Sequence, residues 1–109
     1  MNNLESLTRK YFYYWRNKNV LELSKLLDDE IILQDWENLI IGKEALIKFN
    51  QDFYKKVGKI NLDVISLNFF NKTSFSELKI DIDGFELIVL DKIIFNEKNF
   101  ITNIRAFKG

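Results

Sequence analysis

The second half of the chain, from residue 60 onward, consists of four apolar segments separated by short polar breaks. Asp83-Gly84 separates the second segment from the third, and this dipeptide is a strong signal for a two-residue hairpin turn. The breaks Asn71-Lys72-Thr73 and Asn96-Glu97-Lys98-Asn99 suit somewhat longer turns. Four consecutive strands joined by such turns predict an antiparallel meander. The four predicted strands are Ile60–Phe70, Phe75–Ile82, Phe85–Phe95 and Phe100–Phe107.

The first half of the chain has the spacing of helices. Apolar side chains recur every three or four residues near the N-terminus, which predicts a helix with one apolar and aromatic stripe. A second helix is expected after Asn19, which can cap it, and Glu22 three residues later completes a box-like signal. The stripe residues are Leu4, Leu7, Tyr11 and Trp15 in the first helix, and Val20, Leu23, Leu26 and Leu27 in the second.

A short strand and a third helix complete the predicted order. The segment Ile31–Trp36 is expected to be a strand, and the third helix to begin after Gly42 and end at Gly58. Its stripe residues are Leu46, Phe49, Phe53 and Val57. This order predicts one α+β domain over residues 1–109, with three N-terminal helices packed on a curved antiparallel sheet that can enclose a conical cavity.

The composition excludes several classes of function. The 16 basic and 16 acidic residues are mixed along the chain, so no basic surface for nucleic acid is expected. The absence of Cys and His removes thiol catalysis, disulfides, the commonest general base and the usual zinc ligand. We therefore expect no metal and no cofactor. No signal peptide or apolar run of transmembrane length is recognisable, so we expect a cytoplasmic protein without a membrane partner.

Two carboxylates occupy apolar surroundings. Asp91 interrupts the strand Phe85–Phe95 and shares a face with Leu87, Val89 and Ile93, because strand side chains alternate between faces. Burying an unpaired carboxylate is unfavourable, so this group must be paired or protonated. Asp35 follows another apolar run. Two carboxylates that face one apolar interior indicate a pocket for a small hydrophobic molecule.

The opposite face of the strand Phe85–Phe95 is also apolar, with Ile88, Leu90 and Ile94. A bare apolar face of this size is unusual on a monomer. We therefore expect a homodimer that forms through the outer face of the sheet.

The layout resembles the nuclear transport factor 2-like superfamily, also called SnoaL-like, which includes the steroid delta-isomerases. The resemblance covers almost the whole chain, and it implies the helix-covered curved sheet, or cystatin-like roll, of that superfamily. The segments that carry it are Trp15-Arg16-Asn17-Lys18-Asn19, Leu26-Leu27-Asp28-Asp29-Glu30 leading into Asp35, Gly42-Lys43-Glu44-Ala45-Leu46, Leu90-Asp91-Lys92-Ile93-Ile94-Phe95-Asn96 and Ile104-Arg105-Ala106-Phe107.

The resemblance to the steroid isomerases implies roles for three residues. In those enzymes an Asp base moves a proton while a Tyr and a protonated Asp stabilise the dienolate oxygen. By motif, the base falls on Asp35, the protonated Asp on Asp91 and the Tyr on Tyr11. Two positions depart from the pattern: Asn50 stands where the isomerases have a supporting Tyr, and Trp36 follows the base in place of Pro. Tyr54, one turn after Asn50, is a displaced substitute.

Other interpretations stay open. Asp91 could be a structural carboxyl paired with Tyr11, Arg105 or Lys79, and Asp35 could cap local backbone groups at a strand end. The limonene epoxide hydrolases of the same superfamily use an Asp-Arg-Asp cluster, for which Arg105 is the candidate arginine. A non-catalytic ligand-binding or dimerisation module is the general alternative. The candidate ligand-binding side chains are Trp15, Trp36, Phe49, Phe53, Ile80, Ile93 and Phe107.

Overall fold

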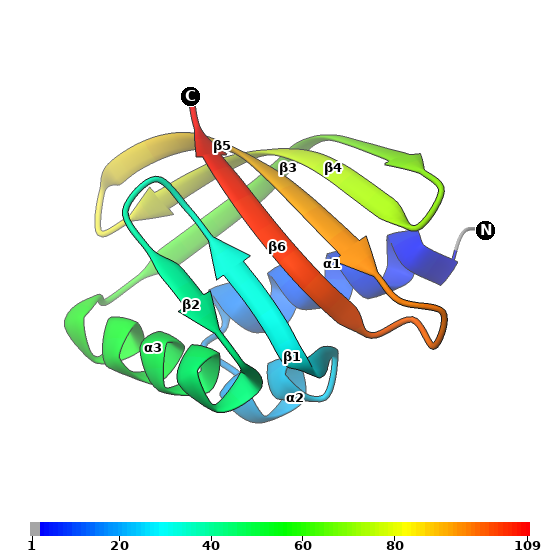
Figure 1. The fold of residues 1–109 in the computed structure, drawn as a ribbon. Helices are drawn as coiled ribbons and strands as arrows, with labels where there is room; N and C mark the ends of the chain where they lie inside the picture. Colours follow the sequence, from blue (N-terminus) through cyan, green and yellow to red (C-terminus); the bar gives the residue numbers. More distant parts are fainter. Residues whose placement is uncertain (1–2) are drawn as a thin grey trace.

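The computed structural model describes residues 3–109, which form three helices and one six-stranded sheet (Figure 1). In chain order the elements are α1 (Asn3–Arg16), α2 (Val20–Ser24), β1 (Leu27–Gln34), β2 (Leu39–Ile41), α3 (Lys43–Lys56), β3 (Ile60–Phe70), β4 (Thr73–Ile82), β5 (Phe85–Phe95) and β6 (Ile101–Lys108).

The strands lie in the order β2-β1-β6-β5-β4-β3, so the last four form the predicted antiparallel meander. Asp83 and Gly84 make the predicted hairpin turn, with φ values of +53° and +89° that favour this dipeptide. The prediction of a wholly antiparallel sheet is wrong in one place, because β1 pairs with β6 in parallel. The sheet is therefore mixed, curved and open.

The helices cover one face of this sheet (Figure 1). Helix α1 packs against β3 and β4, while α3 packs against β1 and β2, and α2 contacts both helices. As predicted, Asn19 caps α2, and its side chain accepts a hydrogen bond from the Glu22 N–H at 3.2 Å. The predicted α+β class is confirmed.

Two local predictions along the chain need correction. The predicted second helix includes Leu26 and Leu27, but α2 ends at Ser24. Leu26 lies in the turn that follows, and Leu27 begins β1, where it pairs with Ile101 of β6. Strand β2 was not predicted, because its three residues are too few to show a periodic pattern. It pairs with the end of β1 and leads into α3 through Gly42, whose φ is +97°.

Helices α1 and α3 are joined at their C-terminal ends. The Tyr54 hydroxyl donates a hydrogen bond of 2.7 Å to the Trp15 carbonyl oxygen. The Lys18 ammonium donates to the carbonyl oxygens of Val57 at 2.8 Å and Tyr54 at 3.4 Å, and so satisfies acceptors that the end of α3 leaves unpaired. These bonds fix how the two helices meet above the sheet.

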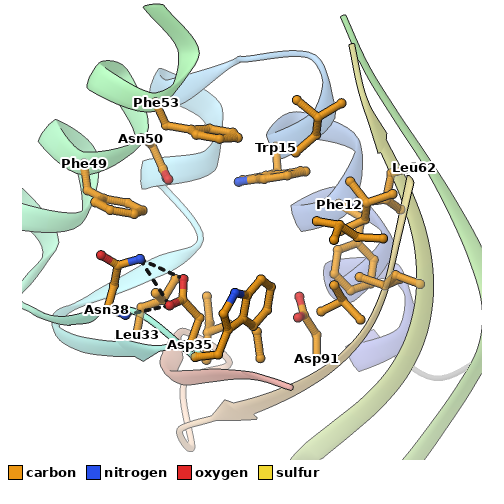
Figure 2. A pocket seen from close by; sticks show the side chains of 18 of the residues that line it. Phe12, Trp15, Leu33, Asp35, Asn38, Phe49, Asn50, Phe53, Leu62 and Asp91 are labelled. Atoms are coloured by element: carbon orange, nitrogen blue, oxygen red, sulfur yellow. Dashed lines mark hydrogen bonds between the residues drawn. The ribbon is translucent and has the colours of Figure 1, made fainter. Parts of the chain in front are cut away.

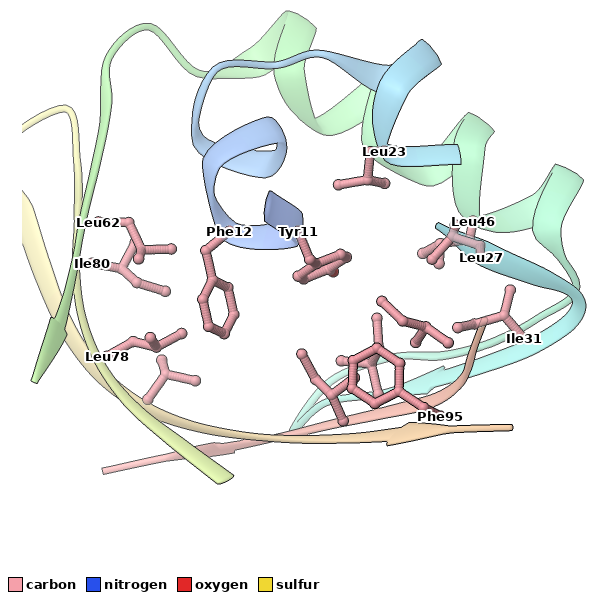
Figure 3. Close-up of a cluster of buried hydrophobic side chains, with 14 of the residues drawn as sticks. Tyr11, Phe12, Leu23, Leu27, Ile31, Leu46, Leu62, Leu78, Ile80 and Phe95 are labelled. Atoms are coloured by element: carbon pink, nitrogen blue, oxygen red, sulfur yellow. The ribbon is translucent and has the colours of Figure 1, made fainter. Parts of the chain in front are cut away.

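The closed core lies toward one end of the space between helices and sheet, where α2, α3, β1 and β5 meet (Figure 3). Its side chains are almost wholly shielded from solvent, and they are mainly aliphatic. Residues of this closed end are Leu23, Leu27, Ile31, Leu46, Ile93, Phe95 and Ile101. The other end of the same space is open.

Candidate functional site

The open end is a pocket of about 470 Å³, a size typical of small-molecule sites. Helices α1 and α3 form one side of it, the inner faces of β4, β5 and β6 form another, and the turn after β1 closes a third (Figure 2). Its walls are largely apolar, and include Phe12, Leu62, Leu78, Ile80, Leu87 and Val89. A few polar side chains project into this apolar space.

Asp91 projects into the pocket from the inner face of β5, as the alternation of the strand predicts. Its register partners are Ser76 on β4 and Ala106 on β6, so no cation lies opposite it in the sheet. Burial in this apolar wall, with a further contribution from the charge of Asp35, raises the pKa of Asp91 to about 7. The carboxyl is therefore suited to carry a proton near neutral pH.

Asp35 lies directly after β1, at the start of the turn that borders the pocket. Its Oδ1 accepts three hydrogen bonds, from the N–H of Glu37 at 2.8 Å, the N–H of Asn38 at 2.7 Å and the Asn38 side-chain amide at 3.1 Å. Its Oδ2 accepts only from the Asn38 amide, at 3.2 Å. Asp35 therefore does cap local backbone groups, while Oδ2 keeps capacity to accept a proton from a ligand (Figure 2).

Tyr11 lies on the buried stripe of α1 and also lines the pocket. Burial is the main cause that raises the pKa of its hydroxyl well above the ordinary value, and the nearby Asp91 and Tyr54 add to it. The phenol therefore stays neutral and can donate a hydrogen bond at any physiological pH. Within residues 3–109 no hydrogen bond joins this hydroxyl to Asp91, which leaves both groups able to turn to a ligand.

Aromatic side chains of α1 and α3 form the side of the pocket opposite β5. The rings of Trp15 and Phe53 are stacked, with centroids 5.9 Å apart and planes 18° apart. Phe49 lines the same side, one turn before Phe53 (Figure 2). Trp36 lies at the mouth with 43% of its surface exposed, and the Lys108 ammonium is 6.0 Å from its ring centre.

Two of the predicted ligand-binding residues do not line the pocket. Ile93 follows Asp91 on the inner face of β5 but lies in the closed core with no exposed surface. Phe107 lies on the outer face of the sheet, where it is the register partner of Leu90 of β5. The alternation of side chains along β6 places it on the face opposite to the predicted one. The other predicted residues, namely Trp15, Trp36, Phe49, Phe53 and Ile80, do line the pocket, as do Tyr11, Asp35 and Asp91.

Arg105 does not join the two aspartates. Its guanidinium lies 5.2 Å from the ring centre of Phe107, on the exposed outer face of the sheet. The described residues therefore contain no Asp-Arg-Asp cluster of the epoxide-hydrolase kind in this pocket.

Asn38 and Asn50 are polar pocket residues that the sequence did not mark as site residues. The signal for Asn38 was its position three residues after Asp35, where an amide can bond back to the carboxylate that opens a turn. Asn50 was identified only as a departure from the isomerase pattern. A buried polar residue on an otherwise apolar helix face is a signal in itself.

The described part of the chain, residues 3–109, holds no group of three or more Asp, Glu, His or Cys side chains placed to bind a metal ion. None of its helices has the length and apolar character needed to span a membrane.

No protein-family model and no curated protein matches the chain. Solved structures do match. A protein from Shewanella denitrificans OS-217, provisionally named a SnoaL-like polyketide cyclase, superposes with a TM-score of 0.92 at 12% identity over 100% of this chain and 92% of its own. An NTF2-like protein of unknown function from Cytophaga hutchinsonii ATCC 33406 gives 0.85 at 12% identity, with the same coverage of 100% and 92%.

The chain has the NTF2-like fold. A further structure, from Kribbella flavida DSM 17836 and provisionally named a ketosteroid isomerase, superposes with a TM-score of 0.86 at 18% identity, over 97% of this chain and 77% of its own. Identities this low establish the common NTF2-like fold and no shared activity. The function must therefore be argued from the side chains in the pocket.

Proposed function

We propose that the protein binds a small hydrophobic carbonyl compound in this pocket and moves a proton within it. Asp35 is the base, and Tyr11 with protonated Asp91 holds the carbonyl oxygen. The observation that carries the proposal is that these three groups, from three different elements, line one apolar pocket. Two carboxyls with unlike surroundings are what a division between base and acid requires.

The proposed reaction is the conversion of a β,γ-unsaturated ketone into its conjugated isomer. Asp35 takes a proton from the carbon between the carbonyl group and the double bond, and the electron pair moves onto the carbonyl oxygen. That oxygen accepts hydrogen bonds from the Tyr11 hydroxyl and the Asp91 carboxyl. Asp35 then returns the proton to the far carbon of the double bond, so the reaction needs no oxidant, water or metal.

The hydrogen bonds of Asp35 support its role as base. Three donors hold Oδ1, and this orients the carboxylate without occupying all of Oδ2. The provisional names of two structural neighbours, ketosteroid isomerase and polyketide cyclase, refer to proteins with ketone chemistry and agree with the proposal.

The test is turnover of cyclohex-3-enone to cyclohex-2-enone, followed by the rise in ultraviolet absorbance of the conjugated product. Asp35→Asn should lower kcat/KM by roughly 10²–10⁴-fold, because the amide cannot accept the proton. The matched control is Asp52→Asn, which removes an aspartate of α3 that pairs with Lys48 outside the pocket. Full activity in Asp35→Asn, with the same circular dichroism spectrum as wild type, would rule out this base.

Binding without chemistry is the second candidate function, favoured by the cap that Asn38 places on Asp35. In that case cyclic ketones would bind with equal affinity to wild type and to Asp35→Asn. No turnover would be measured for either protein.

We further propose a homodimer through the outer face of the sheet. Ile88, Leu90 and Phe107 lie there with 38%, 40% and 44% of their surfaces exposed, and Leu90 is the register partner of Phe107. Leu90→Lys should convert the dimer to monomer in sedimentation equilibrium, because a charge would be buried at the contact. Leu21→Lys, on the exposed side of α2, is the control and should leave the mass unchanged. A wild-type protein that sediments as a monomer would contradict the proposal.

A further inference from the structure

Asn50 is the buried polar residue of α3. It and Leu46 are the two buried residues of this helix, and only 3% of the surface of Asn50 is exposed. Its side chain projects into the pocket between Phe49 and Phe53 and faces Trp15 (Figure 2). A leucine at this position would fill a similar volume without placing an amide in an apolar wall.

The amide of Asn50 lacks the partners that a buried amide normally has. Its Nδ2 is buried and makes no hydrogen bond with any residue of the described chain. Buried amides are nearly always hydrogen-bonded, since an unpaired one lowers the stability of the fold. The unpaired amide therefore lowers the stability of the ligand-free protein, and packing against neighbouring side chains does not explain why an amide stands here.

Other unpaired polar atoms in residues 3–109 differ from it in place and kind. The hydroxyls of Thr8, Ser74 and Ser76 are also buried without a partner, but these residues do not line the pocket. The Nε of Arg16 lies outside it as well. Asn50 alone among them lines the space that a ligand would enter.

We infer that Asn50 is a specificity-determining residue that hydrogen-bonds a second oxygen of the ligand. The amide oxygen of Asn50 faces the pocket (Figure 2), so it can accept a hydrogen bond from a ligand hydroxyl. The inference rests on the proposed function, because that function assigns the first ligand oxygen to Tyr11 and Asp91. The ligand class is then a hydrophobic ring compound with two oxygen functions, one toward β5 and α1 and the other toward α3.

The test uses two rigid probes that differ by one hydroxyl group, 2-naphthol and 2,6-dihydroxynaphthalene, with affinities measured by titration calorimetry. Wild type should bind the diol about tenfold more tightly, the effect of one hydrogen bond in a buried site. Asn50→Leu should bind both probes equally, with 2-naphthol bound at least as tightly as by wild type. Equal binding of the two probes by wild type, or a preference that persists in Asn50→Leu, would overturn the inference.

Two further variants separate this inference from the proposed function. Phe49→Leu is the matched control on α3: it should weaken both probes alike and keep the preference for the diol. Asp91→Leu should weaken both probes by about tenfold, since it removes the donor at the other oxygen. Unchanged affinity in Asp91→Leu would count against the proposed function while leaving the role of Asn50 intact.

Thermal unfolding of the ligand-free proteins decides the role of Asn50 even if neither probe binds. The unpaired amide predicts that Asn50→Leu melts about 4 °C or more above wild type. A midpoint equal to or below that of wild type would show that Asn50 stabilises the empty fold, and would overturn the inference.

Discussion

The inner face of β5 passes through two different regions of the molecule. Leu87 and Val89 line the open pocket, whereas Ile93 and Phe95 lie in the closed core. Asp91 lies between them, at the boundary. The side chains on both sides are similar in size and hydrophobicity, so the strand itself does not distinguish the regions.

The difference comes from what covers the strand. Over the closed end lie the aliphatic side chains of α2, α3 and β1, including Leu23, Leu46 and Ile31 (Figure 3). Over the open end lie the stacked rings of Trp15 and Phe53, with Asn50 beside them (Figure 2). The closed end gains stability from packing, whereas the open end leaves a space that polar as well as apolar side chains line. One strand thus contributes to a filled core at one end and to an open pocket at the other.

The pH dependence of stability is the largest test of this division. Asp91 has a pKa of about 7 in the folded protein and an ordinary value of 3.8 when exposed. Between these values the folded protein holds a proton that the unfolded chain has released, so stability falls as pH rises. At about 1.4 kcal/mol per pH unit the loss is about 4 kcal/mol, complete above about pH 7.

Asp91→Asn should remove this loss of stability with rising pH, because the amide does not ionise. Urea unfolding should therefore show the variant gaining about 4 kcal/mol on wild type between pH 4 and pH 8. Asp63→Asn, at an exposed position of β3, controls for the loss of a carboxylate. Parallel pH curves for wild type and Asp91→Asn would show that the boundary residue is not destabilised by its surroundings.

Truncation of side chains on either side of Asp91 should give the next largest effect. Ile93→Ala leaves a cavity in the closed core and should lower the free energy of unfolding by about 2–5 kcal/mol. Leu87→Ala only widens a space that is already open, and should cost less than about 1 kcal/mol. The measurement is urea unfolding at pH 7. Equal losses in the two variants would mean that both ends of β5 are packed alike.

The smallest effect is expected where α1 and α3 meet above the open end. Tyr54→Phe removes the hydrogen bond to the Trp15 carbonyl oxygen and should lower stability by about 1 kcal/mol. The Trp15 ring should also become less ordered, which a shift in tryptophan fluorescence would report. Tyr13→Phe, on the exposed side of α1, should change neither quantity. If Tyr54→Phe behaves like this control, the bond does not hold the pocket wall.

Much of the fold could be predicted because it depends on local patterns. The alternation in residues 60–107 and the Asp83-Gly84 turn determine the meander, and helical spacing determines α1 and α3. The parallel pairing of β1 with β6 could not be predicted. It joins segments about 70 residues apart, and the residue pattern of one segment does not indicate that the other is its partner. Strand β2 is too short to have a pattern.

The candidate site likewise has features that the sequence predicts and features that it does not. Alternation alone places Asp91 on the inner face of β5, and the apolar neighbours in its strand already imply a raised pKa. Alternation does not tell how far along the strand the pocket extends, so the prediction that Ile93 lines the pocket is wrong. The sequence also could not predict which residues of β6 face inward. Phe107 and Arg105 lie on the outer face of the sheet.

The sequence by itself determined which residue types could carry chemistry here and which face of each strand they would occupy. Without His or Cys, acid–base work falls to carboxyls and phenols, and strand geometry turns Asp91 inward. Only the tertiary structure decided where the interior is filled and where it is empty. Packing is a property of several elements at once, so it required α1, α3 and β5 together to leave Tyr11, Asp35, Asn50 and Asp91 around one space.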